Sequence, residues 1–215
     1  MARIPYTITD EAAAKITLKI HRAFRQNRLA LFDEMNTLQV KKHVHKLYQS
    51  INSAVKNEIF LVLKPLQNEI YEEALALGFD GDLRDLDEAW IEEFFDEFDP
   101  VTKYVFKNEM VRKEARLFED LVAVMKTPGT DKMRSYKTAE NLLIRQIKQA
   151  AINLEDAVVM AVFKAVGVKK VEWVAEDDHK TCKDCNALDG KVFDIKDAPP
   201  KLHIHCRCYF IPVKG

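Results

Sequence analysis

The residues best suited to chemistry lie together at the C-terminal end of the chain. All four cysteines and three of the six histidines fall within the last 37 of the 215 residues. Cys182 and Cys185 form a C-x-x-C pair, and a second cluster follows in His203-Ile204-His205-Cys206-Arg207-Cys208. Two thiolates from one turn and two ligands from a distant loop can complete a tetrahedron around one ion. This pattern predicts a metal site.

Zn²⁺ suits this mixture of sulfur and imidazole ligands. Six candidates compete for four positions. Cys182 and Cys185 with His203 and Cys206 would give a Cys₃His site, and Cys206 with Cys208 would give a Cys₄ site instead. His205 is the sixth candidate. A bound ion would stabilise a segment of about 45 residues that is too small to rely on its own core.

Two other states of the cysteines remain open at this point. They are buried free thiols and disulfides formed after release into an oxidising medium. The N-terminal residues show no apolar signal segment, so we expect synthesis in a reducing cytoplasm, which favours metal. Four cysteines in pairs also argue against a single nucleophilic cysteine, and we expect no enzymatic activity.

The rest of the chain predicts helices that would carry this segment. Apolar residues recur at helical spacing between residues 8 and 166, as in Ile16, Ile20 and Phe24. We expect a break or a kink at Pro65, with a separate helix over 66–77. Further breaks are expected at Asp99-Pro100 and at 127–131. The helical periodicity ends at Gly167, and short strands are expected after it at 171–174, around 192–193 and at 209–211.

The predicted fold is therefore mainly α. It comprises an elongated helical N-terminal body, residues 1–167, and a small α+β, zinc-stabilised C-terminal module, residues 168–215. The longest dense apolar run has five residues, Ile59–Leu63, far short of the ~20 that cross a bilayer, so no membrane partner is expected.

Charge is segregated along the chain although the formal net charge is only −1. Residues 12–67 carry ten Lys/Arg against three acids, whereas residues 80–99 carry ten acids against one Arg. These are solvated helix faces that pair with one another, or they are contact surfaces. The basic side chains that would contact a polyanion such as double-stranded DNA are Lys15, Lys19, Arg22, Arg25 and Arg28. The acidic stretch, which is rich in aromatics, would instead dock a basic partner.

An alternative function is a zinc-dependent nucleic-acid-binding protein or nuclease. An HNH-like nuclease needs a general-base histidine beside an open metal position. His179, His203 and His205, with the neighbouring Asp177 and Asp178, keep that alternative open.

The ordered C-terminal motif resembles that of the phage head morphogenesis family, the minor head proteins similar to the F protein of phage Mu. Its elements are Trp173, Asp178, Thr181-Cys182-x-x-Cys185, Leu188-Asp189-Gly190-x-x-Phe193, Pro199-Pro200 and Leu202-His203-x-x-Cys206-Arg207-Cys208. The stretch Ile152–Glu155 corresponds to a further element of the family, without its Thr.

The resemblance implies a minor capsid protein of a tailed phage or prophage. Such a protein is assembled in the bacterial host cytoplasm and resides in the virion, at the portal vertex or capsid interior. The implied partners are the portal protein, capsid or scaffold proteins and, for some relatives, DNA. The implied role is in head assembly and in genome packaging or ejection.

Overall fold

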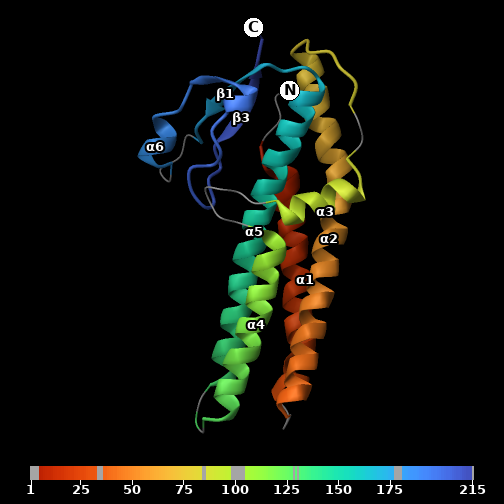
Figure 1. The fold of residues 1–215 in the computed structure, drawn as a ribbon, viewed down its shortest axis with the longest axis vertical. Coiled ribbons are helices and arrows are strands. Elements are labelled where there is room, and N and C mark those ends of the chain that lie inside the picture. Colours follow the sequence, from red (N-terminus) through yellow and green to blue (C-terminus); the bar gives the residue numbers. More distant parts are fainter. Residues whose placement is uncertain are drawn as a thin grey trace.

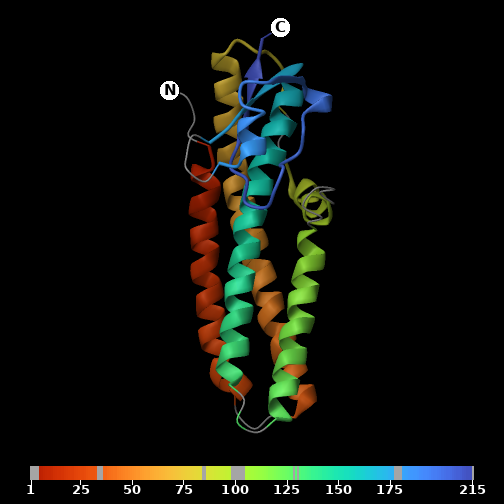
Figure 2. The ribbon, with the colours of Figure 1, turned by 90° about the vertical axis from the view of Figure 1, so that its left-hand side faces the viewer.

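Four long helices form an elongated bundle in the computed structural model (Figures 1 and 2). The structure describes residues 5–32, 36–83, 86–97, 105–127, 129, 131–176 and 181–214, with side chains for all of these except 29–32. The bundle helices are α1 (Thr7–Phe32), α2 (Thr37–Ala76), α4 (Phe106–Met125) and α5 (Lys132–Ala165). The short helix α3 (Glu88–Asp96) runs across the bundle axis (Figure 1).

The bundle forms because each long helix presents one apolar face. On α1 the residues Ile16, Ile20 and Phe24 recur every four positions and are at most 2% exposed. On α5 the matching positions include Leu143 and Ile147, which pack in the same core. The prediction of a mainly α protein with a small sheet is confirmed. No described helix combines the length and the apolarity that crossing a membrane requires.

The prediction of a separate helix after Pro65 is wrong. Helix α2 is continuous over 40 residues, with Pro65 in its interior, and no separate helix begins at residue 66. Proline removes one N–H from the hydrogen-bond ladder, which weakens a helix locally. Buried side chains on both sides of the proline hold α2 against the bundle, and burial of an apolar side chain is worth about 1.5–3 kcal/mol. These side chains are Val62, Leu63, Leu66 and Ile70.

Local signals in the sequence set the ends of α5. Asp131 caps its N-terminus by accepting from the backbone N–H groups of Met133 and Arg134. At the C-terminus Gly167 adopts a φ of 75°, and Val168 N–H donates to the carbonyl of Phe163 at 2.9 Å. This is a Schellman ending, which a glycine favours because it has no Cβ. The predicted stop at Asp99-Pro100 lies outside the described residues.

A three-stranded antiparallel sheet follows α5. Its strands β1 (Lys170–Val174), β2 (Val192–Asp194) and β3 (Tyr209–Val213) lie in the order β2-β1-β3. The one-turn helix α6 (Lys183–Asn186) and a 3₁₀ turn, Ile195–Asp197, lie between the strands in the sequence. Strand β3 extends through Pro212 to Val213, beyond the predicted 209–211. It tolerates the proline because it is an edge strand and one side of it needs no partner.

The sheet packs on the upper end of the bundle, and one continuous hydrophobic core includes residues of both. Trp173 on β1 is fully buried and meets Phe210 on β3 edge to face, with ring centroids 5.3 Å apart. The N- and C-terminal ends both lie at this end of the molecule (Figure 1). The division into domains at residue 167 stays a prediction.

Candidate metal centre and its anchor to the bundle

The turn that opens α6 brings the first two cysteines together. Cys182 is the N-cap residue of α6, and its Sγ accepts a hydrogen bond from the Cys185 backbone N–H at 3.3 Å. Hydrogen bonds from this backbone lower the pKa of the Cys182 thiol. The C-x-x-C pair therefore already has the geometry of a metal-binding knuckle.

The loop before β3 brings three further ligands to Cys185. The Cys185 Sγ lies 3.4 Å from His203 Nε2 and 3.6 Å from Cys206 Sγ. Two triads result, Cys182–Cys185–His203 and Cys185–Cys206–Cys208, each with its ligand atoms within 4.8 Å of one another. Cys185 belongs to both triads and is the centre of the cluster.

The distances fit a tetrahedral zinc ion. Zn–S bonds of ~2.3 Å and Zn–N bonds of ~2.0–2.1 Å place two sulfurs about 3.8 Å apart, and a sulfur and a nitrogen about 3.5 Å apart. The separations of Cys185 from Cys206 and from His203 are within a few tenths of an ångström of these values. Cys185 can therefore share an ion with Cys206 or with His203. The remaining ligands fall into two separate triads, so closing four ligands around one ion requires a shift of the loop.

Three of the four thiols in the cluster are buried. Cys185, Cys206 and Cys208 are each at most 3% exposed. Burial raises the pKa of the Cys185 and Cys206 thiols, because a thiolate loses its hydration there. A bound metal ion would supply the positive charge that buried thiolates need.

His203 is oriented for coordination through Nε2. Its Nδ1 lies 3.0 Å from the backbone carbonyl oxygen of Ile204. A carbonyl only accepts, so this contact assigns the proton to Nδ1 and leaves the lone pair of Nε2 facing Cys185.

His205 is the one sequence candidate that the structure does not bring to the cluster. Its side chain is exposed, and its backbone N–H donates to Gln149 Oε1 on α5 at 2.7 Å. The part of the imidazole that is shielded from water, together with the nearby Arg145 and Lys148, lowers its pKa. Five of the six candidates are therefore adjacent, and His205 instead fixes the loop to the bundle through its backbone.

A buried polar network ties the start of α1 to α5. Glu155 on α5 is 1% exposed. Its Oε1 accepts from the Tyr6 backbone N–H at 2.7 Å and its Oε2 accepts from Thr9 Oγ1 at 2.9 Å. The carboxylate thus satisfies donors at the N-terminus of α1, where the helix dipole also favours negative charge.

The same network reaches the cysteine–histidine cluster through the Tyr6 hydroxyl. This oxygen lies 3.0 Å from both Asp156 Oδ1 and the Cys208 carbonyl oxygen, and it accepts from Lys201 Nζ at 2.5 Å. Lys201 is 7% exposed, also donates to the Cys208 carbonyl, and pairs with Asp156 at 3.1 Å. Burial raises the pKa of Asp156 to about 6, although Lys201 opposes the shift. We call Tyr6, Glu155, Asp156 and Lys201 the anchor.

Sequence reasoning missed the anchor, although one signal for it was present. Ala151, Glu155, Val158 and Val162 have helical spacing, so an acid occupies a position on an apolar face. A charge at such a position needs a buried partner. The partner, the Tyr6 backbone, is 149 residues away, and nothing in the sequence pattern connects the two.

The basic residues of α1 lie on its exposed side. Lys15, Arg22, Arg25 and Arg28 are exposed and form no ion pair with a described acidic residue. Lys19 is paired with Glu58 of α2. Four of the five predicted polyanion contacts are therefore accessible. The predicted nuclease residues Asp177, Asp178 and His179 lie outside the described residues.

The comparisons with known proteins agree with the C-terminal motif. Residues 113–211 match the family described as Phage Mu protein F like protein. The match begins within α4 and ends within β3, so it includes α5 and every residue of the cysteine–histidine cluster. No curated protein and no solved structure matches the chain.

Proposed function

We propose a portal-associated role in phage head assembly for this chain, whose residues 113–211 belong to the Phage Mu protein F like family. The resemblance of its motif to head morphogenesis proteins is thereby confirmed, and the family implies association with the virion. In the proposed role the chain is a minor capsid protein that contacts the portal and the capsid interior. It assists genome packaging or ejection and catalyses no reaction.

The match between the family segment and the folded site carries this proposal. The family segment ends three residues past Cys208, and it contains the cluster, the carboxylates Glu155 and Asp156, and Lys201. These residues connect helix α5 to the C-terminal sheet rather than surround an open catalytic position. Such an arrangement supports a rigid structural element more than an enzyme active site.

The cysteine–histidine cluster is proposed to bind one structural Zn²⁺. Cys185 would be a ligand in every arrangement, because both triads share it. Cys182 and His203 are the candidates on one side of Cys185, and Cys206 and Cys208 are those on the other, so the other three ligands would come from these four. When bound, the ion would cross-link α6 to the loop before β3, and the chain's own residues would position His203 and fix the Cys208 backbone.

DNA contact by the exposed basic side of α1 is part of the same proposal. Lys15, Arg22 and Arg25 are accessible, and such residues bind phosphates without reading sequence. Substitution of Arg22 and Arg25 by Gln should weaken salt-dependent DNA binding in a filter assay. Substitution of the exposed Lys183 and Lys191, outside α1, is the matched control and should have no comparable effect.

Deletion of the gene in its phage or prophage tests the head-assembly role. We expect the protein in purified particles, and we expect the deletion to yield heads that fail to package or eject DNA. Its absence from particles, together with normal and infectious heads after deletion, would overturn the proposal. Metal-dependent DNA cleavage that is lost in His203→Ala, in a protein that still folds, would support the nuclease alternative instead.

A further inference from the structure

A groove of about 750 Å³ lies between α3, α5 and the loop that leads to Lys201. Its α3 wall contains Trp90 and Phe94, and these rings stack with centroids 5.9 Å apart and planes 9° from parallel. The α5 wall combines the apolar side chains of Ala157, Met160 and Ala161 with the polar side chains of Asn153, Asp156 and the exposed Lys164. Aromatic rings opposite small side chains leave an apolar channel into which another chain can insert side chains.

The remaining wall is a short rigid segment. Ala198, Pro199 and Pro200 line the groove beside Lys201, and Phe210 of β3 also contributes to it. Proline fixes the backbone φ, so this wall loses little conformational freedom when a partner binds. The groove is therefore largely preformed.

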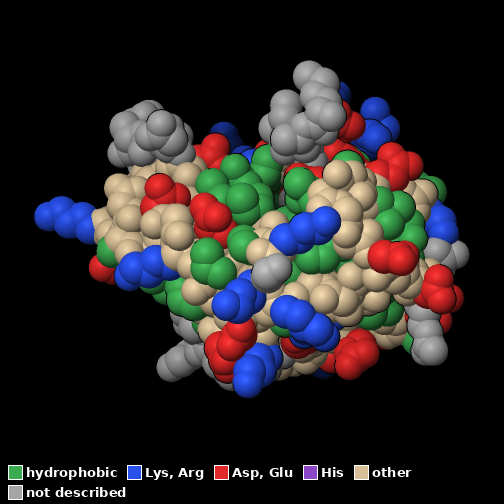
Figure 3. All heavy atoms as spheres, turned by 90° about the horizontal axis from the view of Figure 1, so that it is seen from above, with side chains coloured by type: hydrophobic (Ala, Val, Ile, Leu, Met, Phe, Trp, Pro, Cys, Tyr) green, Lys and Arg blue, Asp and Glu red, His purple; other side chains and the backbone are tan. Residues whose placement is uncertain are grey.

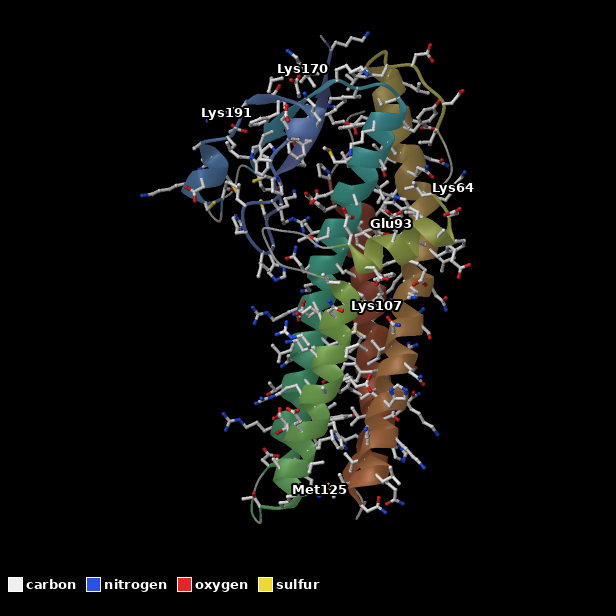
Figure 4. All side chains as sticks on the ribbon, viewed as in Figure 1. Lys64, Glu93, Lys107, Met125, Lys170 and Lys191 are labelled. Atoms are coloured by element: carbon white, nitrogen blue, oxygen red, sulfur yellow. The ribbon has the colours of Figure 1, made fainter. Side chains whose placement is uncertain are left out.

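The rim of the groove on α3 is acidic. Glu93 and Glu97 line it and are exposed, and neither makes an ion pair with a described residue. Asp96 also lines it and pairs with Lys107 at 2.9 Å. Figure 4 labels Glu93 on α3 and Lys107 near the start of α4. From above, hydrophobic side chains alternate with charged ones at this end of the molecule (Figure 3).

Beneath the floor of the groove lies a buried acceptor that has no partner among the described residues. Asp156 lines the groove, and its Oδ1 is bound to Tyr6 and Lys201. Its Oδ2 is buried and receives no hydrogen bond from any residue that the structure describes. A buried carboxylate oxygen of this kind is costly unless a donor reaches it.

We infer that this groove is the docking site for a basic, apolar segment of a head-assembly partner. Such a segment would place an aromatic or aliphatic side chain between Trp90 and the proline wall. Its Lys or Arg side chains would lie against Glu93 and Glu97. The inference rests on the proposed function, because it identifies the surface through which the chain would bind that assembly.

Binding of the full-length chain to the purified portal, major capsid and scaffold proteins of the same phage tests the inference. Biolayer interferometry at low and high salt would compare wild type with Glu93→Lys/Glu97→Lys and with Trp90→Ala. Glu72→Lys and Glu119→Lys are matched controls, because both residues are exposed acids outside the groove. Circular dichroism would establish that each variant is folded.

We expect at least one of these partners to bind, with affinity that falls as salt rises. The double charge reversal and Trp90→Ala should each weaken binding by about tenfold or more, whereas the controls should stay within about twofold. Overlapping peptides from the bound partner should place the interaction on a segment with Lys or Arg beside apolar residues.

Two results would overturn the inference separately from the proposed function. Partner binding that is unaffected by both groove variants would refute the docking site while leaving the assembly role intact. Binding through an acidic partner segment would do the same. If wild type binds none of the three proteins, the portal and capsid role fails and the inference falls with it.

Discussion

The hydroxyl group of Tyr6 is the point where the anchor can be tested with least disturbance. Tyr6 is 1% exposed, and its oxygen contacts Asp156, Lys201 and the Cys208 carbonyl. Tyr6→Phe removes that oxygen and keeps the ring, so it creates almost no cavity. It leaves Asp156 with Lys201 as its one remaining described partner.

The expected loss follows from the charges of these partners. A hydrogen bond to a charged group contributes about 1.5–3 kcal/mol to stability. The free energy of unfolding should therefore fall by about 2 kcal/mol, and since chains of 150–250 residues lose about 2–4 °C per kcal/mol, Tm should fall by about 4–8 °C. Urea unfolding followed by circular dichroism, at equal metal content, would measure the change in midpoint at constant slope.

Tyr48→Phe provides the matched control. Tyr48 is 2% exposed, and its hydroxyl is buried with no hydrogen-bond partner among the described residues. Removing an unsatisfied buried hydroxyl should be neutral or slightly stabilising, within about 0.5 kcal/mol. If both variants lose the same stability, or if Tyr6→Phe loses less than about 0.5 kcal/mol, the anchor does not stabilise the fold as argued.

Three further perturbations address the metal, the buried carboxylate and a close backbone contact. Cys185→Ser should abolish metal binding, because Cys185 belongs to both ligand triads, whereas His205→Ala should retain it, because His205 belongs to neither. Elemental analysis with thiol titration measures both, and bound metal in Cys185→Ser would refute the site. The pKa of Asp156 is raised from 3.8 to about 6, so the folded state binds more protons between these values. The stability contributed by this group is therefore present at about pH 4 and lost as pH rises through 6. Urea unfolding at pH 4.5 and 7 should show a smaller difference for Asp156→Asn than for wild type, and equal differences would contradict the shift. Gly81→Ala would place a Cβ 2.7 Å from the backbone at the C-terminal end of α5, and should lower the free energy of unfolding by about 1–3 kcal/mol. Asp80→Ala, at an exposed position, is the control and should be nearly neutral in the same melts.

The sequence predicted the helices that apolar periodicity determines. Phe24 and Ile147 lie where a 3.6-residue repeat expects core, and α5 begins after the predicted break at 127–131 and ends before Gly167. The separate helix predicted after Pro65 is wrong because tertiary burial on either side of the proline outweighs its local propensity to break a helix. Boundaries that depend on packing are therefore less predictable from sequence than faces that depend on periodicity.

The candidate site was predictable to the extent that its ligands are close in sequence. The C-x-x-C spacing alone placed Cys182 and Cys185 together, and the H-x-x-C spacing suggested His203 with Cys206. Spacing could not exclude His205, whose orientation depends on a backbone φ of 61° and on the contact with Gln149. The anchor was harder to predict from sequence than the cluster, because its members come from both ends of the chain.

The anchor depends on residues outside the family segment. Residues 113–211 supply Glu155, Asp156 and Lys201, whereas Tyr6 and Thr9, which donate to Glu155, lie outside that segment. A chain without the start of α1 would remove these two donors from a buried carboxylate, at a cost of about 1–3 kcal/mol. Cys208 contributes its thiol to the cluster and its carbonyl to Tyr6 and Lys201. A metal ion bound there would therefore order the same backbone that holds the N-terminal end of α1 in place.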